Sequence, residues 1–132
     1  MPQFAPYTKR TLLGESSTAG TTGITAEVDM QNWTGVFFWG NIGTTAAGAH
    51  TLAGLIGAST TDTFVAISGA TKASTAGNDT VELDIYKPAE RWVQATFTST
   101  AATEKTLLAI QYGPRNLQAN TTNVTLVVGS AT

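Results

Sequence analysis

The sequence lacks cysteine and is poor in charge, with seven Lys and Arg and nine Asp and Glu among 132 residues. The lack of cysteine excludes disulfides, thiolate metal ligands and a thiol nucleophile. Binding to a phosphate backbone needs clustered basic side chains, whereas these are spread along a chain of net charge -2. We therefore expect no nucleic-acid partner.

Long apolar runs are also missing. The longest, Val36 to Trp39, is far shorter than the roughly 20 residues that span a bilayer as a helix. The first 17 residues do not show the basic and then apolar pattern of a secretory signal. We expect no membrane partner and synthesis in a reducing cytoplasm.

Groups that could carry out catalysis are scarce. His50 is the single histidine and lies in a Gly/Ala-rich stretch, which predicts a solvated loop residue instead of a general base or metal ligand. Glu82 and Asp84 alternate along one expected strand, about 7 Å apart, which fits a carboxylate pair but more often marks a solvated strand face. The Gly-rich segments 14–20 and 40–48 match neither a P-loop nor a dinucleotide-binding turn. We predict a non-enzymatic protein with no cofactor and no metal.

Thr, Ala, Gly and Val are abundant, and this composition favours strands over helices. In residues 80–86 the apolar side chains alternate with polar ones, as expected of a strand with one buried face. The pattern predicts an all-β antiparallel sandwich, jelly-roll-like, with about eight strands. The strands are expected near residues 25–30, 35–40, 51–57, 63–67, 80–86, 91–97, 106–112 and 123–128.

The N-terminal region differs in composition from the rest. It carries Phe4 and Tyr7 with two prolines and is followed by a Gly/Ser/Thr-rich stretch. We predict an extended N-terminal arm and linker over residues 1–23 and a single β-sandwich domain over residues 24–132. Apolar side chains on such an arm would bind a neighbouring subunit. The alternative is that the arm packs as an edge strand on its own domain.

The segment from residue 80 to 112 predicts a meander of three antiparallel strands. Arg91 and Arg115 follow prolines at its strand boundaries. We expect at least one of them to pair with a carboxylate, bidentate if well ordered. The acids closest in sequence are Glu82, Asp84 and Glu90.

Aromatic residues give the clearest signal of an interface. Phe37 and Trp39 would share one face of a strand, with Val36 and Phe38 on the other. A strand that is apolar on both faces is either central in a sandwich or covered by another subunit. Trp92 lies beside a basic residue on a polar strand face, a composition common at interfaces. The candidate protein-interface residues are Phe4, Tyr7, Trp33, Trp39, Trp92 and Arg115.

Three segments, "NWTGVFFWGNIG", "VELDIYKPAERWVQATF" and "LLAIQYGPR", resemble a family of small virion structural proteins of tailed bacteriophages and prophages. That family has a D/N-aromatic-x-G-V-x-F segment followed by the pattern DIYRPxxRYVR…AIxYGPRK. The matching residues are Trp33, Gly35, Val36, Phe38, Asp84, Ile85, Tyr86, Pro88, Arg91, Val93, Ala109, Ile110, Tyr112, Gly113, Pro114 and Arg115. The chain departs from the pattern at Lys87, Trp92, Gln94 and Asn116, which weakens an electrostatic role for these segments.

The resemblance implies a virion structural protein that binds the outer surface of the capsid shell as a decoration or cement protein. It implies the phage major capsid protein as partner and a location on the capsid surface. We further expect a homo-oligomer, either a trimer or a dimer. A first alternative is a structural protein of the head–tail junction or tail. A second is a carbohydrate-binding β-sandwich module that uses Trp33, Trp39 or Trp92 as a stacking platform.

Overall fold

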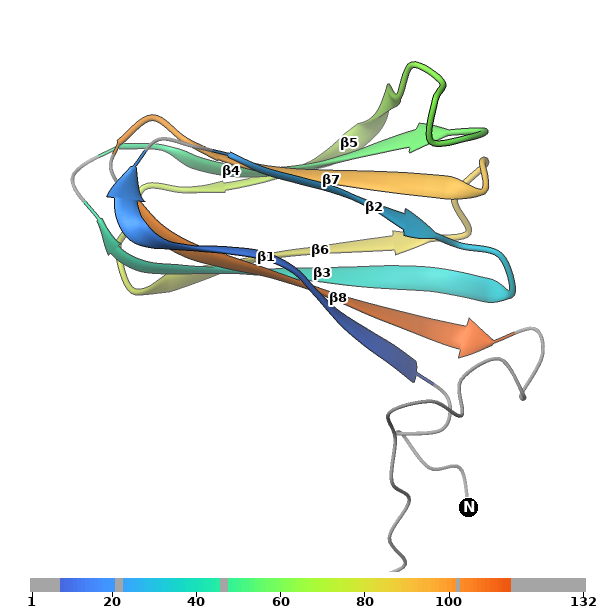
Figure 1. The fold of residues 1–132 in the computed structure, drawn as a ribbon, viewed down its shortest axis with the longest axis horizontal. Coiled ribbons are helices and arrows are strands. Elements are labelled where there is room, and N and C mark those ends of the chain that lie inside the picture. The colour runs from blue at the N-terminus through green and yellow to red at the C-terminus, as the bar shows by residue number, and fades with distance from the viewer. Residues whose placement is uncertain (1–7, 21–22, 46–47, 102, 115–132) are drawn as a thin grey trace, which may run out of the picture.

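The computed structural model describes residues 8–20, 23–45, 48–101 and 103–114, and these contain eight strands and no helix (Figure 1). None of the described elements is therefore a helix that could cross a membrane. The strands are β1 (Thr8–Gly20), β2 (Ile24–Asp29), β3 (Trp33–Thr45), β4 (His50–Gly57), β5 (Val65–Ser74), β6 (Asp79–Tyr86), β7 (Trp92–Ser99) and β8 (Thr103–Pro114).

The strands form two antiparallel sheets of four that lie face to face (Figure 1). The first sheet has the order β1-β8-β3-β6, and the second has the order β2-β7-β4-β5. Apart from β4 and β5, successive strands belong to opposite sheets. This is the strand order of a jelly roll. The predicted all-β antiparallel sandwich is confirmed.

Alternation along the strands explains the core. In β3 the side chains of Val36, Phe38 and Ile42 point between the sheets, and none of them is more than 1% exposed. In β7 the odd-numbered residues are buried and the even-numbered residues face outward. Burying each large apolar side chain contributes about 1.5–3 kcal/mol, so this two-residue period is what holds the sheets together. The other core residues below 2% exposure are Leu52, Val81, Val93, Ala95, Phe97, Leu107 and Ala109.

Seven expected strands correspond to β2 through β8, and the eighth, residues 123–128, lies outside the described residues. The structure corrects the expected arm and linker over residues 1–23, because Thr8–Gly20 forms the edge strand β1. Its pairing with β8 starts at Thr8 opposite Tyr112. Backbone hydrogen bonds of this kind do not require apolar side chains, so a Thr/Ser/Gly-rich segment can form a strand. The sandwich therefore includes residues 8–20, ahead of the expected start at residue 24.

The predicted three-stranded meander is wrong. Strand β6 pairs with β3, β7 pairs with β2 and β4, and β8 pairs with β1 and β3. The connections after β6 and after β7 carry the chain from one sheet to the other. A short turn with a proline can join two neighbouring strands of one sheet or connect one sheet to the other. The turn residues alone do not distinguish these two cases.

Candidate protein interface

The three segments that carry the family resemblance meet at one end of the sandwich, which we call the motif end (residues 29–35, 84–91 and 111–114). Strand β3 begins there, between the end of β8 and the end of β6. Trp33 pairs with Pro114, and Gly35 pairs with both Tyr112 and Tyr86. Segments that are far apart in sequence are thus neighbours in one sheet.

Tyr112 connects the strands of the motif end across their outer surface. Its hydroxyl donates a hydrogen bond of 2.5 Å to Asp84 Oδ1, and to reach it the ring crosses over Gly35 of β3. A Cβ at Gly35 would lie 2.3 Å from Tyr112 Cζ, so no larger residue fits beneath the ring. Burial and the neighbouring Asp84 carboxylate raise the pKa of Tyr112, so the phenol stays protonated and keeps donating at physiological pH.

Backbone contacts fix the loops of the motif end. The Lys87 amide donates to the Thr34 carbonyl at 2.8 Å, and the Thr34 hydroxyl donates to the Gly113 carbonyl at 2.6 Å. Lys87 and Gly113 both have positive φ, 51° and 64°. Residue 87 therefore adopts a left-handed conformation that a non-glycine residue uses only where its surroundings stabilise it.

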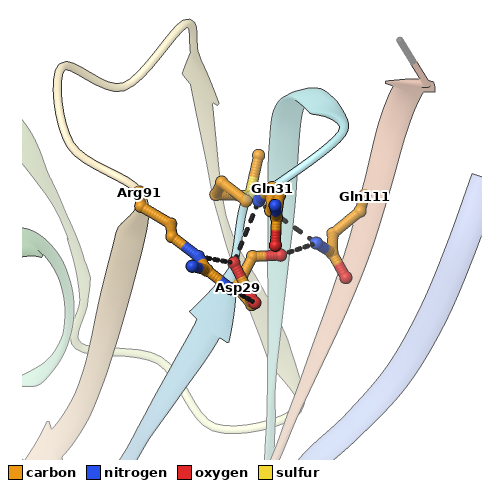
Figure 2. A network of polar contacts seen from close by, with 5 residues as sticks. Asp29, Gln31, Arg91 and Gln111 are labelled. Carbon is orange, nitrogen blue, oxygen red and sulfur yellow. Dashed lines mark hydrogen bonds and ion pairs between the residues drawn. The ribbon is translucent and has the colours of Figure 1, made fainter. Parts of the chain in front are cut away.

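An ion pair joins the strands of the second sheet at the same end (Figure 2). Arg91 donates through Nε to Asp29 Oδ1 at 2.9 Å and through Nη2 to Asp29 Oδ2 at 2.8 Å. The Gln31 amide also donates to Asp29 Oδ1, and the Gln111 side chain of the first sheet donates to the Asp29 carbonyl at 2.7 Å. The Arg91 hydrogen bond holds the pKa of Asp29 below its ordinary value. Because both side chains are substantially exposed, the pair mainly fixes the orientation of the loops.

The predicted arginine–carboxylate pair is therefore confirmed for Arg91, but its partner is Asp29 and not Glu82, Asp84 or Glu90. The reason is the sheet assignment of β7, which places Asp29 opposite Trp92. A cavity of about 370 Å³ lies beside this pair, between the turn after β2 and the loop before β7. It is large enough to receive a side chain from a partner.

The tryptophans chosen from the sequence lie in three different environments. Trp33 is only 5% exposed and belongs to the core. Trp92 is half-buried and faces outward, with the Arg91 guanidinium 5.7 Å from its ring. Trp39 is 41% exposed in the middle of β3. Phe4, Tyr7 and Arg115 lie outside the described residues.

Trp39 is part of an apolar outer surface of the first sheet that sequence reasoning found only in part. The strand register aligns side chains in rows across this face, so that neighbours in a row are in contact distance. One row is Leu12, Leu108, Trp39 and Glu82; the next is Arg10, Ile110, Phe37 and Asp84; the third contains Tyr112, Gly35 and Tyr86. We call the apolar members of these rows the outer patch: Leu12, Phe37, Trp39, Tyr86, Leu108, Ile110 and Tyr112.

The outer surface of the second sheet has a different composition. Its rows mix polar side chains with mostly small apolar ones: one is Glu27, Gln94, Leu55 and Ala66, and the next is Thr25, Thr96, Ala53 and Thr71. Gln94 donates a hydrogen bond of 3.0 Å to Glu27 across the strands. Large exposed apolar patches are rare on surfaces that contact only water, and they usually mark interaction sites. The difference between the two faces makes the outer patch a candidate protein interface.

A buried polar cluster lies at the end of the sandwich opposite the motif end. His50 begins β4 and is fully buried, so the prediction of a solvated loop residue is wrong. Its Nδ1 lies 3.0 Å from Ser99 Oγ, to which buried Lys105 also donates at 3.2 Å. Burial lowers the pKa of both His50 and Lys105. The preceding Gly/Ala-rich residues suggested a loop at His50, but the strand expected at residues 51–57 starts one residue earlier, at His50.

The part of the chain that the structure describes contains no group of three His, Cys, Asp or Glu side chains that could hold a metal ion. The titratable groups that do come together are the Asp29–Arg91 pair, the Tyr112–Asp84 hydrogen bond and the His50 cluster. In each of these, the contacts connect strands or loops of the fold. The arrangement is suited to presenting rigid surfaces.

No protein-family model and no curated protein matches the sequence. Solved structures with a similar fold include the PBSX exported protein XepA, with a TM-score of 0.63 and 13% identity over 99% of this chain. This chain spans 43% of XepA. The SPBc2 prophage-derived protein YomS matches with a TM-score of 0.54 and 10% identity, over 80% of this chain and 93% of YomS.

A third similar structure is from Bacillus endospore appendages that form disulfide-linked pili, with a TM-score of 0.50 and 17% identity. It covers 81% of this chain and 87% of that one. The present chain has no cysteine, so it cannot form links of that kind. At these identities the comparisons show a shared sandwich fold.

Proposed function

We propose that the chain is a non-enzymatic virion structural protein of a bacteriophage that binds the outer surface of the capsid shell as a decoration protein. One observation carries the proposal. The three segments that resemble the phage family, far apart in sequence, are joined at the motif end by Tyr112, Asp84, Thr34 and the Asp29–Arg91 pair. That the prophage-derived YomS has a similar fold supports the same origin.

The motif end is the surface that we propose faces the shell. Strand β1 begins and β8 ends there, with Thr8 opposite Tyr112, so residues 1–7 and 115–132 continue from this end. Three of the candidate interface residues, Phe4, Tyr7 and Arg115, belong to those terminal segments. The fixed loops and the cavity beside Arg91 offer a preformed contact, which lowers the entropic cost of binding.

Electron microscopy of particles from the phage or prophage that encodes the protein tests this function. Copies spread over the head shell, with density at the motif end against the shell, would support the proposal. A single ring of copies at one vertex would instead support the head–tail junction. Particles that lack the protein altogether would contradict a virion role.

The surface variant Arg91→Ala gives a sharper version of the test. It removes the ion pair that orients the motif end, while the apolar core is left intact. We expect the variant to fold and to bind purified shells several-fold more weakly than the wild type. Lys72→Ala, an exposed lysine of β5, is the matched control and should bind as the wild type does.

A carbohydrate-binding module remains the second candidate because Trp39 exposes part of its ring on a sheet face, where a sugar could stack. Its neighbours in the row are Leu108 and Glu82. Binding on a glycan array that is lost in Trp39→Ala would favour this function over shell binding. Binding that is lost in Trp92→Ala would favour it equally.

A further inference from the structure

The middle row of the three that contain the outer patch has residues of opposite charge at its two edges. Arg10 lies on the edge strand β1, and Asp84 lies on the edge strand β6. Between them in that row are the apolar side chains Ile110 and Phe37. The side chains of Arg10 and Asp84 are both exposed.

We propose that a second copy of this chain covers the outer patch in a twofold-symmetric, face-to-face dimer. The inference goes beyond the proposed function and does not depend on it. A twofold axis parallel to the strands, between β8 and β3, would lay β1 of one copy over β6 of the other. It would also lay β8 over β3 and keep each row over the same row.

This operation pairs the two charged residues of the middle row with each other. Arg10 of one copy faces Asp84 of the second copy, and the reverse contact is made by symmetry. Ile110 faces Phe37 and Leu108 faces Trp39, so the two central strands bring apolar side chains together. At the edges of the neighbouring row, Leu12 faces Glu82. The Arg10–Asp84 row is the middle one of three, so a rotation of the packed sheets by about 30° displaces its edges by only about one residue.

A foreign partner would bind a patch with any distribution of charge. Opposite signs at the two edges of one row are what a twofold axis through the centre of the row requires. A twofold axis along the row, perpendicular to the strands, would instead put Arg10 on Arg10 and Asp84 on Asp84. The charge pattern therefore selects the second copy, and it also selects the axis.

The size of the face sets the expected strength. Four strands about 4.8 Å apart and three rows about 6.8 Å apart give about 400 Å² per copy, or about 800 Å² in total. That total lies in the range of weak, transient interfaces. We therefore expect a reversible dimer with a dissociation constant of about 10 µM, which forms readily where copies are concentrated.

Sedimentation of the full chain from about 1 to about 500 µM tests the dimer, since this range brackets the expected constant. The mass should rise from that of a monomer to that of a dimer. Tryptophan emission should shift to the blue over the same range as Trp39 is buried. Trp39→Ser should remain a monomer, whereas Val65→Ser, an exposed apolar residue of β5 on the second sheet, should dimerise as the wild type does.

Charge reversal tests the axis. Arg10→Asp places like charges opposite each other and should weaken the dimer at least tenfold, as should Asp84→Arg. The double variant with both changes restores opposite charges and should recover most of the affinity. Lys72→Asp on the second sheet is the control of equal charge change and should have no effect.

Salt gives a measurement that does not need the Asp84 variant to fold. Added salt should weaken the wild-type dimer and strengthen that of Arg10→Asp, because it screens attraction in the first and repulsion in the second. A chain that stays monomeric throughout the concentration range overturns the proposal. So does a dimer that Trp39→Ser and Arg10→Asp leave intact, or one that is lost only when residues 115–132 are deleted.

Discussion

Gly35 has no side chain, and the Tyr112 ring lies where a Cβ at residue 35 would be. The ring is too close to the backbone for a methyl group to fit beneath it. We predict that Gly35→Ala displaces the ring, breaks its hydrogen bond to Asp84 and lowers the free energy of unfolding by about 2 kcal/mol. Urea unfolding measures the loss. In a Tyr112→Ala background the same substitution should cost almost nothing, and an equal cost there would show that the ring is not the cause.

His50 should make stability depend on pH above the carboxylate range. In the folded protein, burial holds the pKa of His50 below its ordinary value of 6.5. As pH falls through 6.5 the unfolded chain therefore takes up a proton that the folded chain does not. The stability is complete above pH 6.5 and decreases below it, with a slope of at most about 1.4 kcal/mol per pH unit.

The corresponding measurement is urea unfolding of the wild type and His50→Gln at pH 7.5, 6.5 and 5.5. The wild type should lose stability between the last two values, and the variant should be nearly flat there. Parallel curves for the two proteins would assign the pH dependence to other groups. The Asp29 carboxyl does not interfere, since its lowered pKa affects stability only near and below 3.8.

At the scale of elements, β1 is part of the sandwich, so deleting its first residues should destabilise the fold. Residues 8–12 pair with β8, and Leu13, at the register shift that follows, packs against the core. We predict that deleting residues 1–13 lowers the free energy of unfolding by about 3 kcal/mol more than deleting residues 1–7 does. Thermal unfolding of both truncations measures the difference. Equal melting temperatures would mean that the sandwich does not need the first half of β1.

The strands that sequence could predict are those in which apolar and polar residues alternate, as Val81, Leu83 and Ile85 do in β6. Strand β1 could not be found in this way, because it is held by backbone pairing to β8 and shows little apolar periodicity. The partner of Arg91 was missed for a related reason. Asp29 is 62 residues away in sequence, and only the assignment of β7 to the second sheet brings the two together. Local patterns specify strands, but the pairing of strands depends on the whole chain.

The same limit applies to the candidate interface. The sequence predicted that β3 is apolar on both faces, and Trp39 with Phe37 does lie on the outer side. It could not reveal that Leu12, Leu108 and Tyr86 extend that surface over four strands, since this needs the register of β1, β8 and β6. For the same reason, the sequence could not predict that Arg10 and Asp84 lie at opposite edges of one row.

At the scale of the whole molecule, the position of β8 has a consequence for how the protein is made. This strand is the last of the described elements, yet it lies between β1 and β3 inside the first sheet. Until Pro114 has left the ribosome, β1 has no partner strand, and β3 is paired on one side only. At synthesis rates of 5–20 residues per second, the nascent chain waits about 10 s in an incomplete state with exposed sheet edges.

We therefore predict that folding occurs late in synthesis and is slow, on the millisecond-to-second scale of proteins whose contacts join distant parts of the chain. Nascent chains arrested with residue 102 outside the ribosome should be digested rapidly by protease, and those with residue 114 outside should resist it. Early resistance would mean that the second sheet folds alone. If folding does wait for β8, a messenger truncated before β8 yields only unfolded chain, and every folded copy has been translated through that strand.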